Sequence, residues 1–148
     1  MWRRGLKRKA RIPKELRDIT RKLVEHLEDV KAVVLFGSRA RGDWLPWSDY
    51  DLLVIAGYSE PYLERIKKIL DLLADTKLPV EPHPYTPREA LEMLHQGNPI
   101  IVDAIEEGIP LHKTTWYDKL LEEYQELRRR GLKRTKTTIK LPRGPRQT

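Results

Sequence analysis

Two short runs set the plan of this chain: Leu35-Phe36-Gly37-Ser38-Arg39-Ala40-Arg41-Gly42-Asp43 and Ser48-Asp49-Tyr50-Asp51-Leu52-Leu53-Val54-Ile55. In the first run, an apolar segment ends abruptly at Gly37-Ser38, and ten residues separate this turn from Asp49. Asp49 and Asp51 then open a second apolar segment. Because side chains at i and i+2 of a strand point to the same face, both carboxylates should project together beside the glycine–serine turn.

The turn has the composition of a phosphate-binding element. Gly37 has no Cβ and lets the backbone approach a ligand closely, and a turn that leads into a short helix offers backbone N–H groups to an anion. Ser38 offers a hydroxyl to a phosphate oxygen, although it can also cap the helix. Arg39 and Arg41 flank the turn, where they either contact a triphosphate or form a surface ion pair, for example with Asp43.

The two aspartates have the composition of a metal site. A pair of fixed carboxylates provides the hard oxygen ligands that Mg²⁺ prefers. Asp49 has an alternative role as the acceptor that closes a turn. Asp51 has a poorer alternative, because a carboxylate inside an apolar strand is costly unless it is paired or bound to a metal.

The spacing Gly37-Ser38, ten residues, Asp49-Tyr50-Asp51 resembles the signature of the DNA polymerase beta-type nucleotidyltransferases. The form Gly-Ser-Arg-Ala-Arg-Gly-Asp with Ser-Asp-x-Asp-Leu is most similar to the small stand-alone branch, the minimal nucleotidyltransferases. The similarity extends from about Leu16 to His112. It implies the nucleotidyltransferase fold, with the active site at one edge of a small sheet.

The resemblance also implies a third acidic residue. In the family, a third carboxylate lies on a strand after the intervening helix, and Glu81 holds that place after Leu78-Pro79-Val80. Such a carboxylate helps to bind metal or takes up the proton of the acceptor hydroxyl. The alternative for Glu81 is an exposed glutamate on an edge strand. His83 shares its face at i+2, so it either contributes to this site or is a simple surface histidine, and we favour the second interpretation.

The rest of the chain predicts an α/β (α+β) domain in which a small mixed β-sheet is flanked by helices. Apolar spacings of three and four predict helices, and continuous or alternating apolar runs predict strands. Prolines at 79, 82 and 84 restrict the third strand to an edge of the sheet. The expected order is a helix over 16–30, strands over 31–36 and 49–56, a helix over 63–74, the edge strand over 78–84, and helices over 86–97, 98–108 and 115–131.

Charge divides the chain into three parts. The net charge is +7, yet residues 1–14 hold seven Lys or Arg and residues 128–148 hold nine, and neither end has an acidic residue. We therefore expect a basic N-terminal arm over 1–13, a nucleotidyltransferase domain over 14–131 and a basic flexible tail over 132–148. Such arms suit an anionic partner, RNA for example, or simply aid solubility.

Composition excludes several classes of protein. Cysteine is absent, which excludes disulfides and thiolate metal sites and suits a cytoplasmic location. No apolar run approaches the length of a membrane span. The basic N-terminus is followed by no apolar segment, so it is not a secretory signal.

By resemblance, the chain uses two Mg²⁺ ions and ATP or another NTP as substrate. It transfers a nucleoside monophosphate to a hydroxyl acceptor, and the minimal branch resembles antitoxins that partner a HEPN-type RNase toxin and transfer AMP to its tyrosine. The expected catalytic and metal-binding residues are Asp49, Asp51 and Glu81, and the expected nucleotide-binding residues are Gly37, Ser38, Arg39 and Arg41. Alternatives are a non-catalytic nucleotide- or partner-binding module, or nucleotidyl transfer to RNA through the basic arms. The last helix can also form a homo-oligomer seam.

Overall fold

A computed structural model describes residues 12–134 and 138–142. The predicted basic arm over residues 1–11 and the parts of the predicted tail over residues 135–137 and 143–148 lie outside the described residues. None of the helices in the described part combines the length and the apolar character that a membrane span requires. The elements follow one another in the order α1 Lys14–His26, β1 Ala32–Phe36, α2 Ser38–Arg41, β2 Tyr50–Ile55, α3 Tyr62–Leu72, β3 Val80–Tyr85, α4 Pro87–His95, α5 Pro99–Glu107, β4 Ile109–Lys113, α6 Thr115–Arg129, β5 Lys133–Arg134 and β6 Ile139–Lys140.

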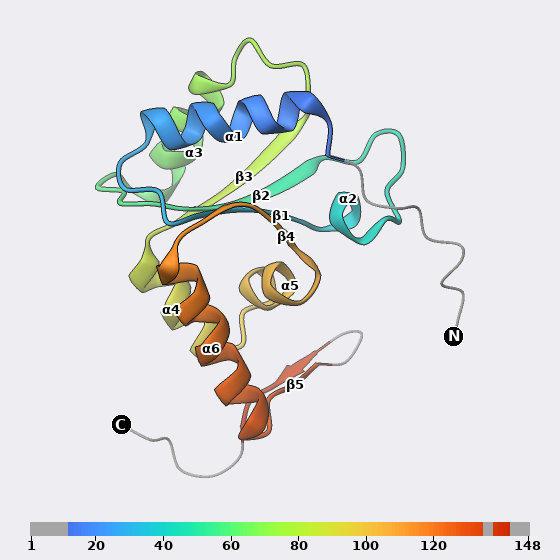
Figure 1. Ribbon diagram of the computed structural model, residues 1–148, viewed down its shortest axis with the longest axis vertical. Helices are drawn as coiled ribbons and strands as arrows, with labels where there is room; N and C mark the ends of the chain where they lie inside the picture. The colour runs from blue at the N-terminus through green and yellow to red at the C-terminus, as the bar shows by residue number, and fades with distance from the viewer. Residues whose placement is uncertain (1–11, 135–137, 143–148) are drawn as a thin grey trace.

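A four-stranded mixed sheet lies at the centre of the molecule, in the order β3-β2-β1-β4. β1 pairs antiparallel with both β2 and β4, whereas β2 and β3 are parallel. Helices α1 and α3 cover one face of the sheet, and α4, α5 and α6 lie on the other (Figure 1). The expected α+β fold is therefore confirmed, as is the edge position of the proline-rich strand β3.

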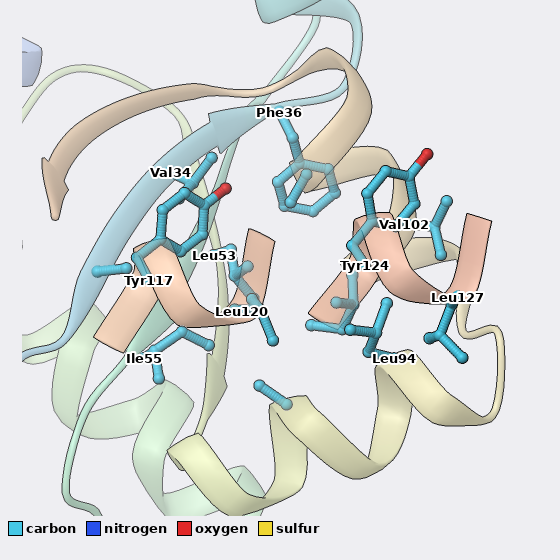
Figure 2. Close-up of a cluster of buried hydrophobic side chains, with 14 of the residues drawn as sticks. Val34, Phe36, Leu53, Ile55, Leu94, Val102, Tyr117, Leu120, Tyr124 and Leu127 are labelled. Atoms are coloured by element: carbon cyan, nitrogen blue, oxygen red, sulfur yellow. The ribbon is translucent and has the colours of Figure 1, made fainter. Parts of the chain in front are cut away.

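The central strands separate two cores because their side chains alternate between the two faces. On β1, Val33 and Leu35 pack against the α1 and α3 side, while Val34 and Phe36 face the other helices. Figure 2 shows the second core, where strand residues meet Tyr117 of α6 and its neighbours. Both faces of β1 and β2 are thus covered, as the nearly continuous apolar runs predict.

Helix α3 buries a narrower stripe than its apolar residues indicate. Ile69 and Leu73 are buried, but Leu63 is 77% exposed and Leu70 is 46% exposed. The helical spacing of the apolar residues over 63–74 predicts that both leucines face the core, and this prediction is wrong. The helix packs over β3, which is the last strand of the sheet, so no further strand extends beneath its outer side.

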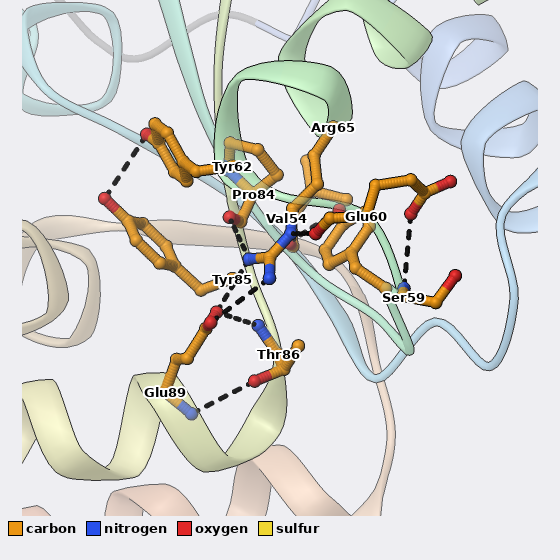
Figure 3. Close-up of polar contacts among 10 residues, drawn as sticks. Val54, Ser59, Glu60, Tyr62, Arg65, Pro84, Tyr85, Thr86 and Glu89 are labelled. Atoms are coloured by element: carbon orange, nitrogen blue, oxygen red, sulfur yellow. Dashed lines mark hydrogen bonds and ion pairs between the residues drawn. The ribbon is translucent and has the colours of Figure 1, made fainter.

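A buried arginine joins α3 to the end of β3 and the start of α4. Arg65 donates from its two terminal nitrogens to the Glu89 carboxylate at 2.7 and 3.1 Å. It also donates to the backbone carbonyl of Glu60 at 2.7 Å and lies over the ring of Tyr58 (Figure 3). Glu89 and Thr86 form the capping box at the start of α4, directly after the end of β3. The Arg65–Glu89 ion pair therefore stabilises the start of this helix and the end of this strand together.

The ordered structure continues past residue 131, where the sequence predicts a flexible tail. Leu132 is only 1% exposed, and β5 pairs with β6 in a two-stranded sheet. Arg134 forms an ion pair with Asp103 of α5 and lies 3.7 Å from Glu106. These contacts hold the β5–β6 pair close to α5.

Candidate active site

The strand register brings two of the expected carboxylates together. β2 and β3 run parallel, with Asp51 opposite Glu81 and Leu53 opposite His83. The start of β2 is held to β3 because the Tyr50 backbone N–H donates to the carbonyl of Pro79 at 2.7 Å. Asp51 and Glu81 are therefore neighbours although the 29 residues 52–80 separate them in the chain.

Gly37 allows the Asp51 carboxylate to lie against the turn. Phe36, the last residue of β1, pairs with Asp51, so the next residue passes directly beside this side chain. A Cβ placed on Gly37 would lie 2.4 Å from Asp51 Oδ2, well inside contact distance. Gly37 also adopts φ 78° and ψ −161°, a combination that is essentially restricted to glycine. The turn and the carboxylate thus require glycine for two independent reasons.

Ser38 begins the short helix α2, and Gly37 is the N-cap residue, so the capping role that the sequence allows for Ser38 does not occur. Among the described residues, the Ser38 hydroxyl has no hydrogen-bond partner. This hydroxyl is consequently available to a ligand that approaches the turn.

Asp49 lies immediately before β2 and is exposed. It lines a cleft of about 370 Å³ together with Glu81 and His83, and Ile66 and Leu70 of α3 complete the wall. Within the described part of the chain, Asp51, Glu81 and His83 form a group that could hold a metal ion, with one ligand atom from each residue and all three atoms within 4.8 Å of one another. The structure therefore brings Asp51 and Glu81 together and places Asp49 at the adjoining cleft.

His83 is less exposed than the favoured interpretation of the sequence predicts. Its side chain is only 14% exposed, and its Nε2 lies 3.1 Å from Asp51 Oδ1 and 3.9 Å from Glu81 Oε2. Its ring meets Phe36 edge-on, with centroids 5.0 Å apart. The interpretation of His83 as a surface histidine is wrong, and the i+2 spacing from Glu81 is the signal that indicates its position.

The two arginines after the turn are engaged within the protein. Arg39 donates to the Ser48 carbonyl at 3.1 and 3.2 Å, and its guanidinium lies between the rings of Trp44 and Tyr50. Arg39 therefore holds the loop between α2 and β2 in place.

Arg41 has acidic partners on two elements. It forms ion pairs with Asp43 at 3.2 Å and with Glu107 of α5 at 3.4 Å. The surface pairing with Asp43 that the sequence suggests as an alternative does occur. Contact of either arginine with a triphosphate stays a prediction.

His83 is the basic side chain that the described residues bring to the acidic site. Across residues 12–134 and 138–142, no lysine or arginine forms an ion pair with Asp49, Asp51 or Glu81. The Asp51 side chain is nevertheless only 25% exposed. Carboxylates that gather without a cation repel one another, so the donor set fits a bound divalent ion with oxygen ligands.

Comparison with known families assigns the chain. A family model described as "Nucleotidyltransferase domain" matches residues 13–112, which is more than half of the sequence. The chain belongs to the nucleotidyltransferase domain family. The family expectation from Gly37-Ser38 and the two aspartates is thus confirmed. A search of curated proteins finds no match.

Solved structures show the same fold at low sequence identity. A chain of a toxin–antitoxin complex with AMP-PNP is 21% identical over 79% of this nucleotidyltransferase and 91% of its own length, with a TM-score of 0.50. A chain from a mutant of the toxin–antitoxin MntA-HpeT is 19% identical, over 80% and 91%, with a TM-score of 0.51. A chain from tri-AMPylated Shewanella oneidensis HEPN toxin in complex with MNT antitoxin is 19% identical, over 76% and 85%, with a TM-score of 0.47.

Proposed function

We propose that this protein is a Mg²⁺-dependent nucleotidyltransferase that transfers AMP from ATP to a tyrosine of a HEPN-type toxin and thereby acts as its antitoxin. The observation that carries the proposal is the position of Asp51. Its carboxylate lies against the Gly37 turn, beside Glu81 and His83, and among the described residues it forms no ion pair with a lysine or arginine. Membership of the nucleotidyltransferase domain family gives this arrangement its chemistry.

The proposal gives each residue of the site a role. Ser38 donates its hydroxyl to a phosphate oxygen of the nucleotide, and Gly37 lets that phosphate approach the backbone. Asp49, Asp51 and Glu81 hold Mg²⁺ with their carboxylate oxygens. When bound, such ions neutralise the phosphates and stabilise the attacking and leaving oxygens of an in-line displacement. Arg39 keeps the loop before Asp49 in position through the Ser48 carbonyl.

In the proposed reaction, the acceptor hydroxyl oxygen forms a bond to the α-phosphorus. The bond from this phosphorus to the bridging oxygen breaks, and pyrophosphate leaves with that electron pair. The hydroxyl proton passes to Glu81 or to water. Glu81 suits this role because its side chain is 54% exposed and lines the cleft beside Asp49, so an acceptor side chain has access to it.

The choice of AMP and of a protein acceptor rests on resemblance. The minimal branch that the motif resembles contains antitoxins, and one of the similar chains comes from a toxin–antitoxin complex with AMP-PNP. Phosphoryl chemistry of this kind depends on positioning and charge neutralisation rather than on a covalent nucleophile. The absence of cysteine from the chain is compatible with such a mechanism.

The proposal is tested by mixing the purified protein, Mg²⁺ and one NTP at a time with the product of the neighbouring gene, which the proposal expects to be a HEPN-type protein. Intact-mass spectrometry of that partner should show AMP addition with ATP, and peptide mapping should place it on tyrosine. Asp49→Asn should abolish the mass gain, while Asp18→Asn on the exposed surface of α1 should leave it unchanged. No gain with any of the NTPs would overturn the proposed function.

A further inference from the structure

His83 lies in the acidic site without a role in the reaction described above. It follows Glu81 by two positions on β3, so both side chains leave the same face of the strand. Its Nε2 points between the two carboxylates, at 3.1 Å from Asp51 Oδ1 and 3.9 Å from Glu81 Oε2. A nearly buried imidazole that faces two acidic groups is a different feature from an exposed histidine on an edge strand.

Packing fixes the ring in this direction. Phe36 contacts the imidazole edge-on with an interplanar angle of 64°, and only 14% of the His83 side chain is exposed. The backbone of β3 is held in register with β2, with His83 opposite Leu53. A ligand on a paired strand, with a packed ring, loses little further freedom when it binds a metal.

The distances agree with three ligand atoms around one ion. Metal–oxygen and metal–nitrogen bonds of transition metals are about 2.1 Å. Two ligands at that distance lie about 3 Å apart at a right angle and about 4 Å apart on opposite sides. The separations of Nε2 from the two carboxylate oxygens fall within this range, and all three ligand atoms lie within 4.8 Å of one another.

We propose that His83 Nε2 is a direct metal ligand beside Asp51 and Glu81, and that it shifts the preference of the site from Mg²⁺ toward Mn²⁺. Mg²⁺ favours oxygen ligands and binds imidazole poorly, whereas imidazole nitrogen suits the later divalent metals. Affinity for a nitrogen-containing site rises across the first-row series from Mn²⁺ to Cu²⁺ and falls again at Zn²⁺. The inference rests on the proposed function in one respect, because it assumes that Asp51 and Glu81 bind the catalytic cation.

The direct test is pulsed electron paramagnetic resonance of Mn²⁺ bound to the full-length protein. A coordinated imidazole gives a ¹⁴N coupling, which should change to a ¹⁵N coupling when the protein is made with ¹⁵N-histidine. Wild-type protein needs no substitution for this measurement, so the result does not depend on the folding of a variant. Mn²⁺ bound without any histidine nitrogen coupling would overturn the proposal.

Substitution assigns the nitrogen to one residue. His83→Gln should remove the coupling and weaken Mn²⁺ binding about tenfold or more, because even outer-shell changes at metal sites have effects of that size. Its Mg²⁺ affinity, measured by competition with Mn²⁺, should change much less. His112→Gln is the matched control, since His112 is a partly buried histidine on β4 outside the acidic site. Equal loss of Mg²⁺ and Mn²⁺ affinity in His83→Gln would reduce His83 to a residue that only positions Asp51, and would overturn the proposal.

The readouts separate this proposal from the proposed function. Histidine coupling to bound Mn²⁺ without transfer of any nucleotide would support the metal ligand and reject the transferase. The opposite outcome is Mg²⁺-dependent transfer that His83→Gln leaves unchanged, with bound Mn²⁺ that shows no nitrogen coupling. That outcome would support the transferase and reject His83 as a metal ligand.

Discussion

Substitution of Gly37 by alanine should reduce both nucleotide transfer and stability. The added Cβ would lie 2.4 Å from Asp51 Oδ2, whereas ordinary contact begins at 3.4 Å, so the carboxylate has to retreat by about 1.0 Å. A displacement of that size at a reacting centre lowers the rate by about 100-fold. The glycine-only backbone conformation adds a strain of about 1–3 kcal/mol.

Gly97→Ala is the matched control for this experiment. Gly97 also has a positive φ, of 70°, but a Cβ there would meet the flexible end of Leu141 at 3.0 Å, outside the acidic site. Both variants should therefore lose stability in thermal unfolding, and only Gly37→Ala should lose transfer of label from α-labelled ATP. A Gly37→Ala protein with the wild-type transfer rate would refute the argument that this turn positions Asp51.

Further predictions concern the nucleotide site and the Arg65 ion pair. Ser38→Ala should weaken ATP binding by about tenfold, the loss of about one hydrogen bond to a charged group, and should leave thermal unfolding unchanged. Arg65→Ala should lower the free energy of unfolding by about 3 kcal/mol, the low end for a broken buried pair because the Glu89 side chain is 40% exposed. Denaturant titrations should show less than about 0.5 kcal/mol for Arg88→Ala, whose side chain is 89% exposed. The bond from Arg65 lowers the pKa of Glu89 below its ordinary value of 4.5. The stabilisation that the ionised Glu89 gives to the folded state is therefore complete well above pH 4.5, and it is lost as the pH falls through the lowered pKa of Glu89 in the folded protein. Wild type and Glu89→Gln should consequently converge in stability in acid.

Local patterns predict most of the elements of this fold. The Thr86–Glu89 capping box and the Asn98-Pro99 helix start occur as the sequence indicates. Prolines correctly place β3 at the edge of the sheet. Leu63 and Leu70 are exposed although their helical spacing favours burial, because spacing indicates a face but not how wide the neighbouring sheet is.

The site follows from the sequence less completely. The resemblance predicts that Glu81 lies near the two aspartates, which the i+2 rule places on one face of the strand, and the parallel register of β2 and β3 puts Glu81 opposite Asp51. The same rule applies to His83, but a proline-rich edge strand offers no pattern that indicates burial of one histidine. Phe36 supplies that burial from a different strand. Likewise, the contacts of Arg39 with Trp44 and Tyr50 depend on a loop path that sequence spacing does not specify.

Separate labels on the two ends of the ATP triphosphate test the central claim most directly. The full-length protein, Mg²⁺ and the HEPN-type partner are incubated with ATP that carries the label in either the α- or the γ-phosphate. The account predicts that the α-label becomes bound to the partner, that the γ-label leaves as pyrophosphate, and that Asp51→Asn stops both. Protein-bound γ-label, or ATP binding without any transfer of the α-label, would contradict it.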